Sequence, residues 1–267
     1  MHIVEIRGGL GNQMFCYAFG QNFADVLYDI SAYGSSEKRP LDLQLYDIKK
    51  IYANKEQTKP YLKKSKLPRF VRKLLNVPPY KNVTREKNST SFEPGLLQIE
   101  DSYFKGYFQN ENYFKHNRVQ ILHDFKLLKP LDEANAELLK QIKQTNSVSL
   151  HVRRGDYLTA GFKILNTDYY QKAMDYVAER VKNPHFYIFS NDFDWVRENI
   201  KSKYEQTIVD INDESRGYFD LELMRNCKHN IIANSTFSWW GAWLNENPDK
   251  IVVSSEGNNL PADWIII

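Results

Sequence analysis

The chain has 267 residues, of which 42% are hydrophobic and 14% aromatic, and its formal net charge is +3. This length and composition allow a folded protein with a buried core and exclude a disordered chain. No apolar run approaches the roughly 18 residues of a transmembrane helix, and the first residues read as a strand rather than as a secretion signal. Cys16 and Cys227 lack the spacing of a metal site and fit reduced thiols in the cytoplasm.

The first half of the chain gives few clear elements. Alternating and helical apolar patterns predict a strand over 2–6, a helix over about 14–28, a strand over 104–109 and a helix over 131–144. Residues 31–100 give mixed signals. The polar pair Thr145-Asn146 follows the last helix, so we predict domains of residues 1–145 and 146–267.

Within the first predicted domain, residues 49–87 form a strongly basic segment. It holds thirteen Lys or Arg against two acids, a local charge of +11. Its mixture of basic and apolar residues suits an anionic membrane surface, where each Lys or Arg contributes about 1 kcal/mol. A solvated loop fits the same composition equally well, and nucleic acid is disfavoured because no other motif supports it. Because the sequence shows no secretion signal and its two cysteines fit reduced thiols, we expect a cytoplasmic protein. Whether this segment places it at the inner face of the membrane is left open.

Beyond residue 146 the pattern becomes regular. The expected strands cover 147–152, 186–189, 206–209, 230–233 and 250–253, and the expected helices cover 167–181, a stretch from about 194, 219–227 and 239–245. Strands that alternate with helices in this way predict parallel βαβ units of the nucleotide-binding type.

Three loops follow strands at their C-terminal ends, where open α/β sheets bind ligands. One carries Arg153 and Arg154, whose planar side chains can hold a phosphate through paired hydrogen bonds. Surface salt bridges are the commoner use of a bare Arg-Arg pair, but the surrounding sequence favours the phosphate site. A second, Arg7–Gln13, has glycines that allow close backbone approach, but Met14 breaks the dinucleotide-binding fingerprint. The third places Ser235, Thr236 and Ser238 before a helix, where they either contact a phosphate or cap the helix.

Other polar residues are more ambiguous. Asp220 lies in an expected helix and either reads a base edge or faces solvent. Asp192 and Asp194 could bind Mg²⁺, but Asp194 could equally cap a helix, and the six histidines lack zinc-site spacing. We therefore predict no metal site.

Three motifs occur in this order along the chain: Arg7-Gly-Gly-Leu-Gly-Asn-Gln-Met-Phe, His151-Val-Arg-Arg-Gly-Asp-Tyr and Asn234-Ser-Thr-Phe-Ser-Trp-Trp-Gly-Ala-Trp-Leu. With these motifs the chain resembles the galactoside α-1,2-fucosyltransferases of glycosyltransferase family 11. The resemblance implies a GT-B-like fold of two Rossmann-type α/β domains, with the active site in the cleft between them. It implies transfer of L-fucose from GDP-β-L-fucose to the 2-hydroxyl of a terminal galactoside, with inversion and without a metal or other cofactor. Residues 1–145 would bind the acceptor, a galactose-terminated oligosaccharide or lipid-linked glycan, and residues 146–267 the donor.

The resemblance also assigns residues. Arg153 and Arg154 would clamp the diphosphate beside His151, and Ser235, Thr236 and Ser238 would form a phosphate loop. Asn12 would contact the diphosphate or the fucose and is counted with Arg153, Arg154 and Asp156 as a catalytic residue. Independently of the resemblance, Gly9, Gly11 and Asp220 complete the set of expected donor contacts. Asp156 is the first candidate for the catalytic base; alternatively it positions the arginines, whose charge would lower its pKa.

Three other functions remain open at this point: fucosyl transfer with another linkage, binding of a sugar nucleotide without catalysis, and an NAD-dependent oxidoreductase, which Met14 disfavours.

Overall fold

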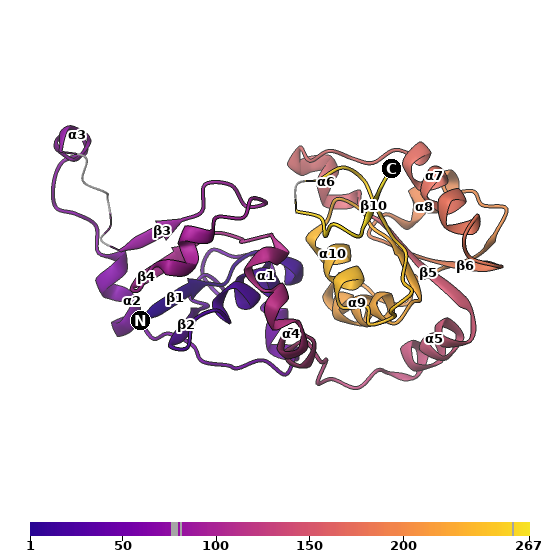
Figure 1. The fold of residues 1–267 in the computed structure, drawn as a ribbon, viewed down its shortest axis with the longest axis horizontal. Coiled ribbons are helices and arrows are strands. Elements are labelled where there is room, and N and C mark those ends of the chain that lie inside the picture. The colour runs from indigo at the N-terminus through magenta and orange to yellow at the C-terminus, as the bar shows by residue number, and fades with distance from the viewer. Residues whose placement is uncertain (76–79, 81, 258) are drawn as a thin grey trace. The chain divides into compact units, whose positions relative to one another are not determined.

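The computed structural model describes residues 1–75, 80, 82–257 and 259–267, so residues 76–79 and 81 of the predicted basic segment lie outside the described part (Figure 1). The chain divides into two compact units, Met1–Lys126 and Leu127–Ile267. Each unit is built on a parallel sheet, so the predicted α/β class is confirmed.

The first unit has a short parallel sheet in the order β2-β1-β4-β3. Its strands are β1 (His2–Glu5), β2 (Val26–Asp29), β3 (Val83–Arg85) and β4 (Ser102–Lys105), and its α-helices are α1 (Leu10–Gly20), α2 (Lys55–Leu62), α3 (Arg69–Leu74) and α4 (Arg118–Asp124). Four short 3-10 helices connect them: η1 (Asp42–Leu45), η2 (Pro94–Gln98), η3 (Glu111–Tyr113) and η4 (Lys115–Asn117). Nearly every residue of α1 is buried, which makes this helix the centre of the unit.

The predicted helix over 14–28 is partly wrong. Helix α1 ends at Gly20, and Val26–Asp29 is instead strand β2, which pairs with β1. The apolar residues of 22–28 fit the spacing of a helix as well as that of a strand. Pairing with β1 makes Val26–Asp29 a strand. Gly20 permits the arrangement because a Cβ there would lie 2.6 Å from the Tyr28 ring and hydroxyl.

The second unit contains a six-stranded parallel sheet in the order β10-β9-β8-β5-β6-β7. Its strands are β5 (Asn146–Val152), β6 (Pro184–Ser190), β7 (Glu205–Ile208), β8 (His229–Ile231), β9 (Val252–Ser254) and β10 (Ile265–Ile266). Its helices are α5 (Glu133–Gln144), α6 (Gly155–Ala160), α7 (Thr167–Ala178), α8 (Phe193–Asn199), α9 (Gly217–Arg225) and α10 (Thr236–Trp243), with one 3-10 helix, η5 (Glu214–Arg216).

The chain moves outward from β5 through β6 to β7, then returns to β8 on the other side of β5 and continues to β10. This is the strand order of a doubly wound Rossmann sheet, and its topological switch point lies between β5 and β8. The register places Val148 of β5 opposite both Phe186 of β6 and His229 of β8.

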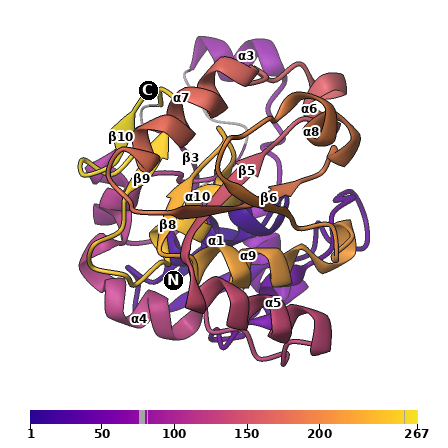
Figure 2. The ribbon, with the colours of Figure 1, turned by 90° about the vertical axis from the view of Figure 1, so that its right-hand side faces the viewer.

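Helices cover both faces of this sheet, as Figure 2 shows with α7 and α8 on one face and α5 and α9 on the other. A hydrophobic core lies on each face of the sheet, and successive side chains of β6 alternate between the two cores. Phe186 and Ile188 pack with the α7 side, whereas Tyr187 and Phe189 pack with the α5 and α9 side. Both faces of the strand are therefore apolar, as is typical of a buried parallel strand.

Two predicted boundaries differ from the structure. Helix α5 belongs to the second unit, because Leu138 and Ile142 pack against Tyr187 of β6, so the contacts divide before α5 and not after it. Helix α10 begins at Thr236 and not at Trp239, because Ser235 caps it by accepting a hydrogen bond from the Phe237 N–H.

Candidate functional site

The switch point of the second unit is bordered by the loops that follow β5 and β8. In doubly wound sheets, ligands bind outside the carboxyl ends of the strands at this position. The β5 loop carries Arg153 and Arg154 and leads directly into α6. The two loops are joined, because the Tyr157 hydroxyl donates to the Asn234 carbonyl oxygen at 3.0 Å. The structure therefore brings together two of the three predicted loops.

Arg153 is held by a carboxylate but keeps donors to spare. Its Nη2 donates to Asp156 Oδ2 at 2.7 Å, and its guanidinium lies 5.6 Å from the centre of the Tyr157 ring. Its buried Nε finds no hydrogen-bond partner among the described residues. A buried, unpaired charged donor is costly unless something else accepts its hydrogen. The guanidinium is thus fixed in direction and has capacity for an anionic ligand.

Arg154 is fixed by a different set of contacts. Its Nε donates to Asp192 Oδ2 at 3.2 Å, and its guanidinium lies 4.2 Å from the centre of the Trp195 ring. Asp192 also caps α8 by accepting from the Trp195 N–H, so Asp194 is not the cap. Cation–π stacking of this kind leaves the edge nitrogens of the guanidinium able to donate.

Asn191, at the end of β6, organises the loop that carries both arginines. Its Oδ1 accepts from the backbone N–H groups of Arg154 and Gly155, each at 3.1 Å. Its Nδ2 donates to Asp156 Oδ1 at 3.3 Å. A Cβ on Gly155 would lie 2.6 Å from Asn191 Nδ2, so glycine is needed for this close approach. Sequence reasoning missed Asn191; the polar run Ser190-Asn191-Asp192 after an apolar strand was the available signal.

His151, on β5 just before the arginines, is buried and 4% exposed. Its Nδ1 has no hydrogen-bond partner among the described residues, and its ring lies 5.7 Å from that of Phe237. Burial, together with the nearby Arg153 charge, lowers the pKa of His151 to about 3. The imidazole is therefore neutral at physiological pH.

The loop after β8 places its hydroxyls differently. Ser235 caps α10, and Thr236 forms the first turn of that helix, so both side chains stand at a helix N-terminus. Ser238 is buried, and its hydroxyl donates to the carbonyl oxygens of Ala233 and Ser235 at 3.4 Å. Of the three predicted phosphate-loop residues, Ser238 thus has its hydroxyl engaged within the loop. The tryptophans of α10 are buried and pack against one another.

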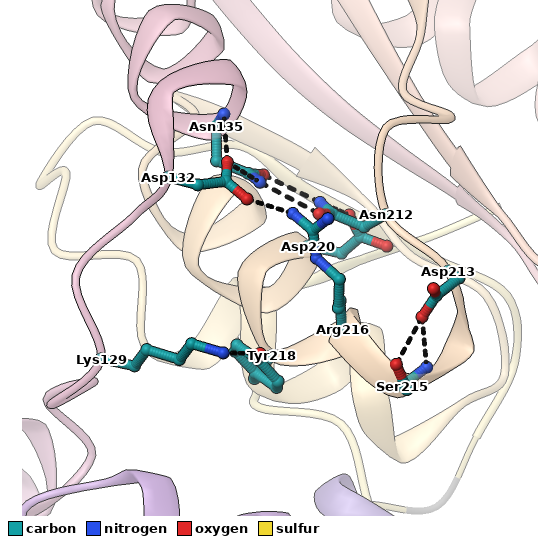
Figure 3. A network of polar contacts seen from close by, with 9 residues as sticks. All are labelled: Lys129, Asp132, Asn135, Asn212, Asp213, Ser215, Arg216, Tyr218 and Asp220. Atoms are coloured by element: carbon teal, nitrogen blue, oxygen red, sulfur yellow. Dashed lines mark hydrogen bonds and ion pairs between the residues drawn. The ribbon is translucent and has the colours of Figure 1, made fainter.

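Asp220 belongs to a buried polar network rather than to the solvated surface (Figure 3). Its Oδ1 accepts from Asn212 Nδ2 at 2.8 Å, and Asn212 exchanges two hydrogen bonds with Asn135. Asp132 caps α5 through Asn135 and forms an ion pair with Arg216. Burial raises the pKa of Asp220 to about 7. The network connects α5 to α9.

The glycine turn of the first unit is held by several side chains that sequence reasoning did not identify. Gly8 has φ +76°, and its N–H donates to Glu37 Oε2 at 2.9 Å, while its carbonyl accepts from the Tyr33 hydroxyl at 2.8 Å. Asn12 Oδ1 accepts from Gln109 Nε2 at 2.9 Å. Of the two other predicted glycines, Gly9 directly precedes α1 and Gly11 is buried within that helix.

The part of the chain that the structure describes contains no group of three or more His, Cys, Asp or Glu side chains that could hold a metal ion. Among the same residues, no helix is both long enough and apolar enough to cross a membrane. Cys16 and Cys227 are buried free thiols.

A doubly wound parallel sheet with a fixed guanidinium pair at its switch point is typical of α/β proteins that bind phosphorylated ligands. The model of glycosyl transferase family 11 matches residues 1–262. The chain therefore belongs to this family and is a glycosyltransferase, which confirms the predicted resemblance.

Three relatives and two solved structures illustrate the similarity. The chain is 31% identical to the O-antigen biosynthesis glycosyltransferase WbnK of Escherichia coli over 95% of both chains. It is 33% identical to an alpha-1,2-colitosyltransferase of Escherichia coli over 91% of this chain and 87% of the relative. It is 34% identical to galactoside alpha-(1,2)-fucosyltransferase 1 of Leontopithecus chrysomelas over 49% of this chain and 40% of the relative.

The solved structures are more distant. NodZ alpha-1,6-fucosyltransferase, co-crystallised with GDP, has a TM-score of 0.48 and 12% identity over 90% of both chains. A glycosyl transferase of family 9 from Veillonella parvula has a TM-score of 0.45 and 10% identity over 100% of this chain and 86% of that chain.

Proposed function

We propose that this protein transfers L-fucose from GDP-β-L-fucose to the 2-hydroxyl of a terminal galactoside, with inversion at the fucose anomeric carbon. Membership of family 11 supports the proposal, as do relatives named for α-1,2 transfer of fucose or colitose. The observation that carries it is the guanidinium pair at the switch point, because the leaving group of this reaction is a diphosphate. The second unit would bind the donor, and the first unit a galactose-terminated oligosaccharide or lipid-linked glycan.

Stabilisation of the leaving group is the main task of the site. As the bond between fucose and GDP breaks, negative charge grows on the diphosphate, and donors that are already oriented stabilise it without reorganisation. Arg153 and Arg154 are oriented in advance by Asp156, Asp192 and the Trp195 ring. These fixed guanidiniums would supply the positive charge that a divalent metal supplies in other glycosyltransferases, so we propose that no metal is required.

Asp156 fits a positioning role better than that of a base. Its two carboxylate oxygens accept from Arg153 Nη2 and Asn191 Nδ2. An ion pair stabilises the carboxylate, and an anion held in this way is a weaker proton acceptor. We therefore assign Asp156 to the orientation of Arg153. The acceptor hydroxyl would lose its proton to another group.

Colitosyl transfer is the second candidate, favoured by the 33% identity to an alpha-1,2-colitosyltransferase over most of both chains. Colitose is fucose without its 3-hydroxyl. A donor site that hydrogen-bonds this hydroxyl discriminates strongly against the deoxy sugar, whereas an apolar site discriminates weakly.

The test is incubation of the purified protein with GDP-fucose, lactose and excess EDTA, with the linkage of the product determined by NMR. The proposal expects an α-1,2-fucosylated galactose whose rate EDTA does not change. A parallel incubation replaces GDP-fucose with GDP-colitose. A product with GDP-colitose but none with GDP-fucose would favour the second candidate. Absence of turnover and of GDP binding would refute both.

A further inference from the structure

Helix α3, in the basic segment, presents large apolar side chains to solvent. Phe70, Leu74 and Leu75 are 73%, 82% and 58% exposed, and no residue of α3 is buried. Figure 1 shows α3 standing apart from the sheet of its own unit, beyond β3. Phe70 and Leu74 are four residues apart and therefore lie on the same face of the helix. The described part of the first unit therefore leaves most of the surface of these three side chains exposed.

The same stretch is uniformly positive. Residues 63–75 contain six Lys or Arg and no acid, and the nearest acids along the chain are Glu56 and Glu86. Lys63, Lys64, Lys66, Arg69 and Lys73 are exposed. No ion pair is found for any of these five side chains among the described residues. Exposed cations and exposed apolar side chains thus occupy one short segment.

We propose that residues 63–75 form a docking surface for an anionic lipid bilayer. Phe70, Leu74 and Leu75 would enter the boundary between headgroups and acyl chains, while the lysines and arginines would contact the lipid phosphates. The charge complementarity selects this occupant. A nucleic acid would satisfy the cations but would leave the apolar side chains in water, since phosphate contacts dominate such binding. A bilayer satisfies both.

Binding to the bilayer would combine two contributions, the attraction between basic side chains and lipid phosphates and the insertion of apolar side chains. Charge alone or a short apolar contact alone gives marginal, reversible attachment, and the combination of both gives stable attachment. Each contribution should therefore be necessary. This inference does not depend on the proposed function, because binding to vesicles is measured without donor or acceptor.

The experiment is sedimentation of the full chain with vesicles at low salt. Vesicles of phosphatidylcholine and phosphatidylglycerol should carry the protein into the pellet, and vesicles of phosphatidylcholine alone should not. Phe70→Ser/Leu74→Ser should lower the partition coefficient by about tenfold or more. Lys66→Gln/Lys73→Gln should lower it by roughly tenfold.

Two control variants test whether binding depends on residues 63–75 or on exposed apolar and basic side chains anywhere on the protein. Val119→Ser removes an apolar side chain on α4 that is 84% exposed. Lys143→Gln/Lys172→Gln removes the same charge from exposed positions of the second unit. Both controls should pellet like the unmodified protein.

Three outcomes would overturn the proposal. The first is failure of the protein to pellet with anionic vesicles, and the second is an equal loss of binding in the control variants. The third is unchanged binding of Phe70→Ser/Leu74→Ser, which would show that the segment binds polyanions by charge alone.

Discussion

Replacement of Asn191 by alanine tests whether the loop after β5 must be held for catalysis. The half-buried amide makes three hydrogen bonds, two to backbone N–H groups and one to Asp156. A net value of about 1 kcal/mol for each, discounted for partial exposure, gives roughly 2 kcal/mol of loop ordering. If this ordering is needed in the transition state, kcat should fall about thirtyfold. The fold should persist, because the β6 side chains that build the two cores are unchanged.

Asn191→Asp gives a sharper measurement of the same contact. It keeps an oxygen for the two N–H groups but places a carboxylate oxygen where Nδ2 now donates to Asp156, at 3.3 Å. Two carboxylates at this distance raise the pKa of one of them. Activity of Asn191→Asp should therefore recover, relative to Asn191→Ala, as the pH falls and one carboxyl is protonated.

The assay measures kcat and KM for GDP-fucose across pH, with circular dichroism as a check of folding. Asn199→Ala, at an exposed asparagine on the next helix, is the control and should keep full activity. Wild-type kcat in Asn191→Ala, together with a flat ratio of Asn191→Asp to Asn191→Ala across pH, would refute the reasoning.

The remaining predictions concern charge, titration and packing. Arg153→Lys should lower kcat at least tenfold, because an ammonium is a single point of charge and lacks the planar fork that binds Asp156 through one nitrogen and offers its other nitrogens to a phosphate. Arg180→Lys on the surface should leave kcat unchanged, and equal rates for the two variants would contradict the clamp. Burial raises the pKa of Asp220 to about 7, so between about pH 4 and pH 7 the folded protein binds a proton that the unfolded chain does not. The free energy of unfolding should therefore fall as the pH rises through this range. Asp220→Asn should flatten this pH dependence in urea titrations, and an unchanged slope would count against the role of Asp220. Gly20→Ala should destabilise the protein by about 1–3 kcal/mol because the added Cβ would collide with Tyr28. Gly95→Ala is the control, since a Cβ there has no atom within 4 Å, and it should change the urea midpoint little. Equal midpoints for the two variants would contradict the contact between Gly20 and Tyr28.

Five of the six strands of the second unit could be predicted, because the stretches expected at 147–152, 186–189, 206–209, 230–233 and 250–253 overlap β5 to β9. The two-residue strand β10 was not predicted. The two candidate ligand-binding loops could be placed from the same predicted strands, since Arg153 directly follows β5 and Ser235 lies four residues after the end of β8. The confirmed family membership came from the motifs in these loops.

What the sequence could not supply was long-range. Asn191 binds the backbone of Arg154, 37 positions earlier in the chain, and no local pattern encodes that contact. Strand β2 was missed because Val26 and Tyr28 fit both a helix and a strand until pairing with β1 decides. The division of the chain was placed too late because the helical pattern of α5 does not say which sheet it will cover.

The distribution of tryptophan gives the protein a built-in optical probe. All five tryptophans lie in the second unit: Trp195, Trp239, Trp240, Trp243 and Trp264. Intrinsic fluorescence excited at the red edge of the absorption band therefore reports on that unit alone. Comparison with the circular dichroism of the whole chain would reveal whether the two units melt together or in sequence. Because Trp195 lies against the Arg154 guanidinium, its emission should also change when an anion occupies the switch point.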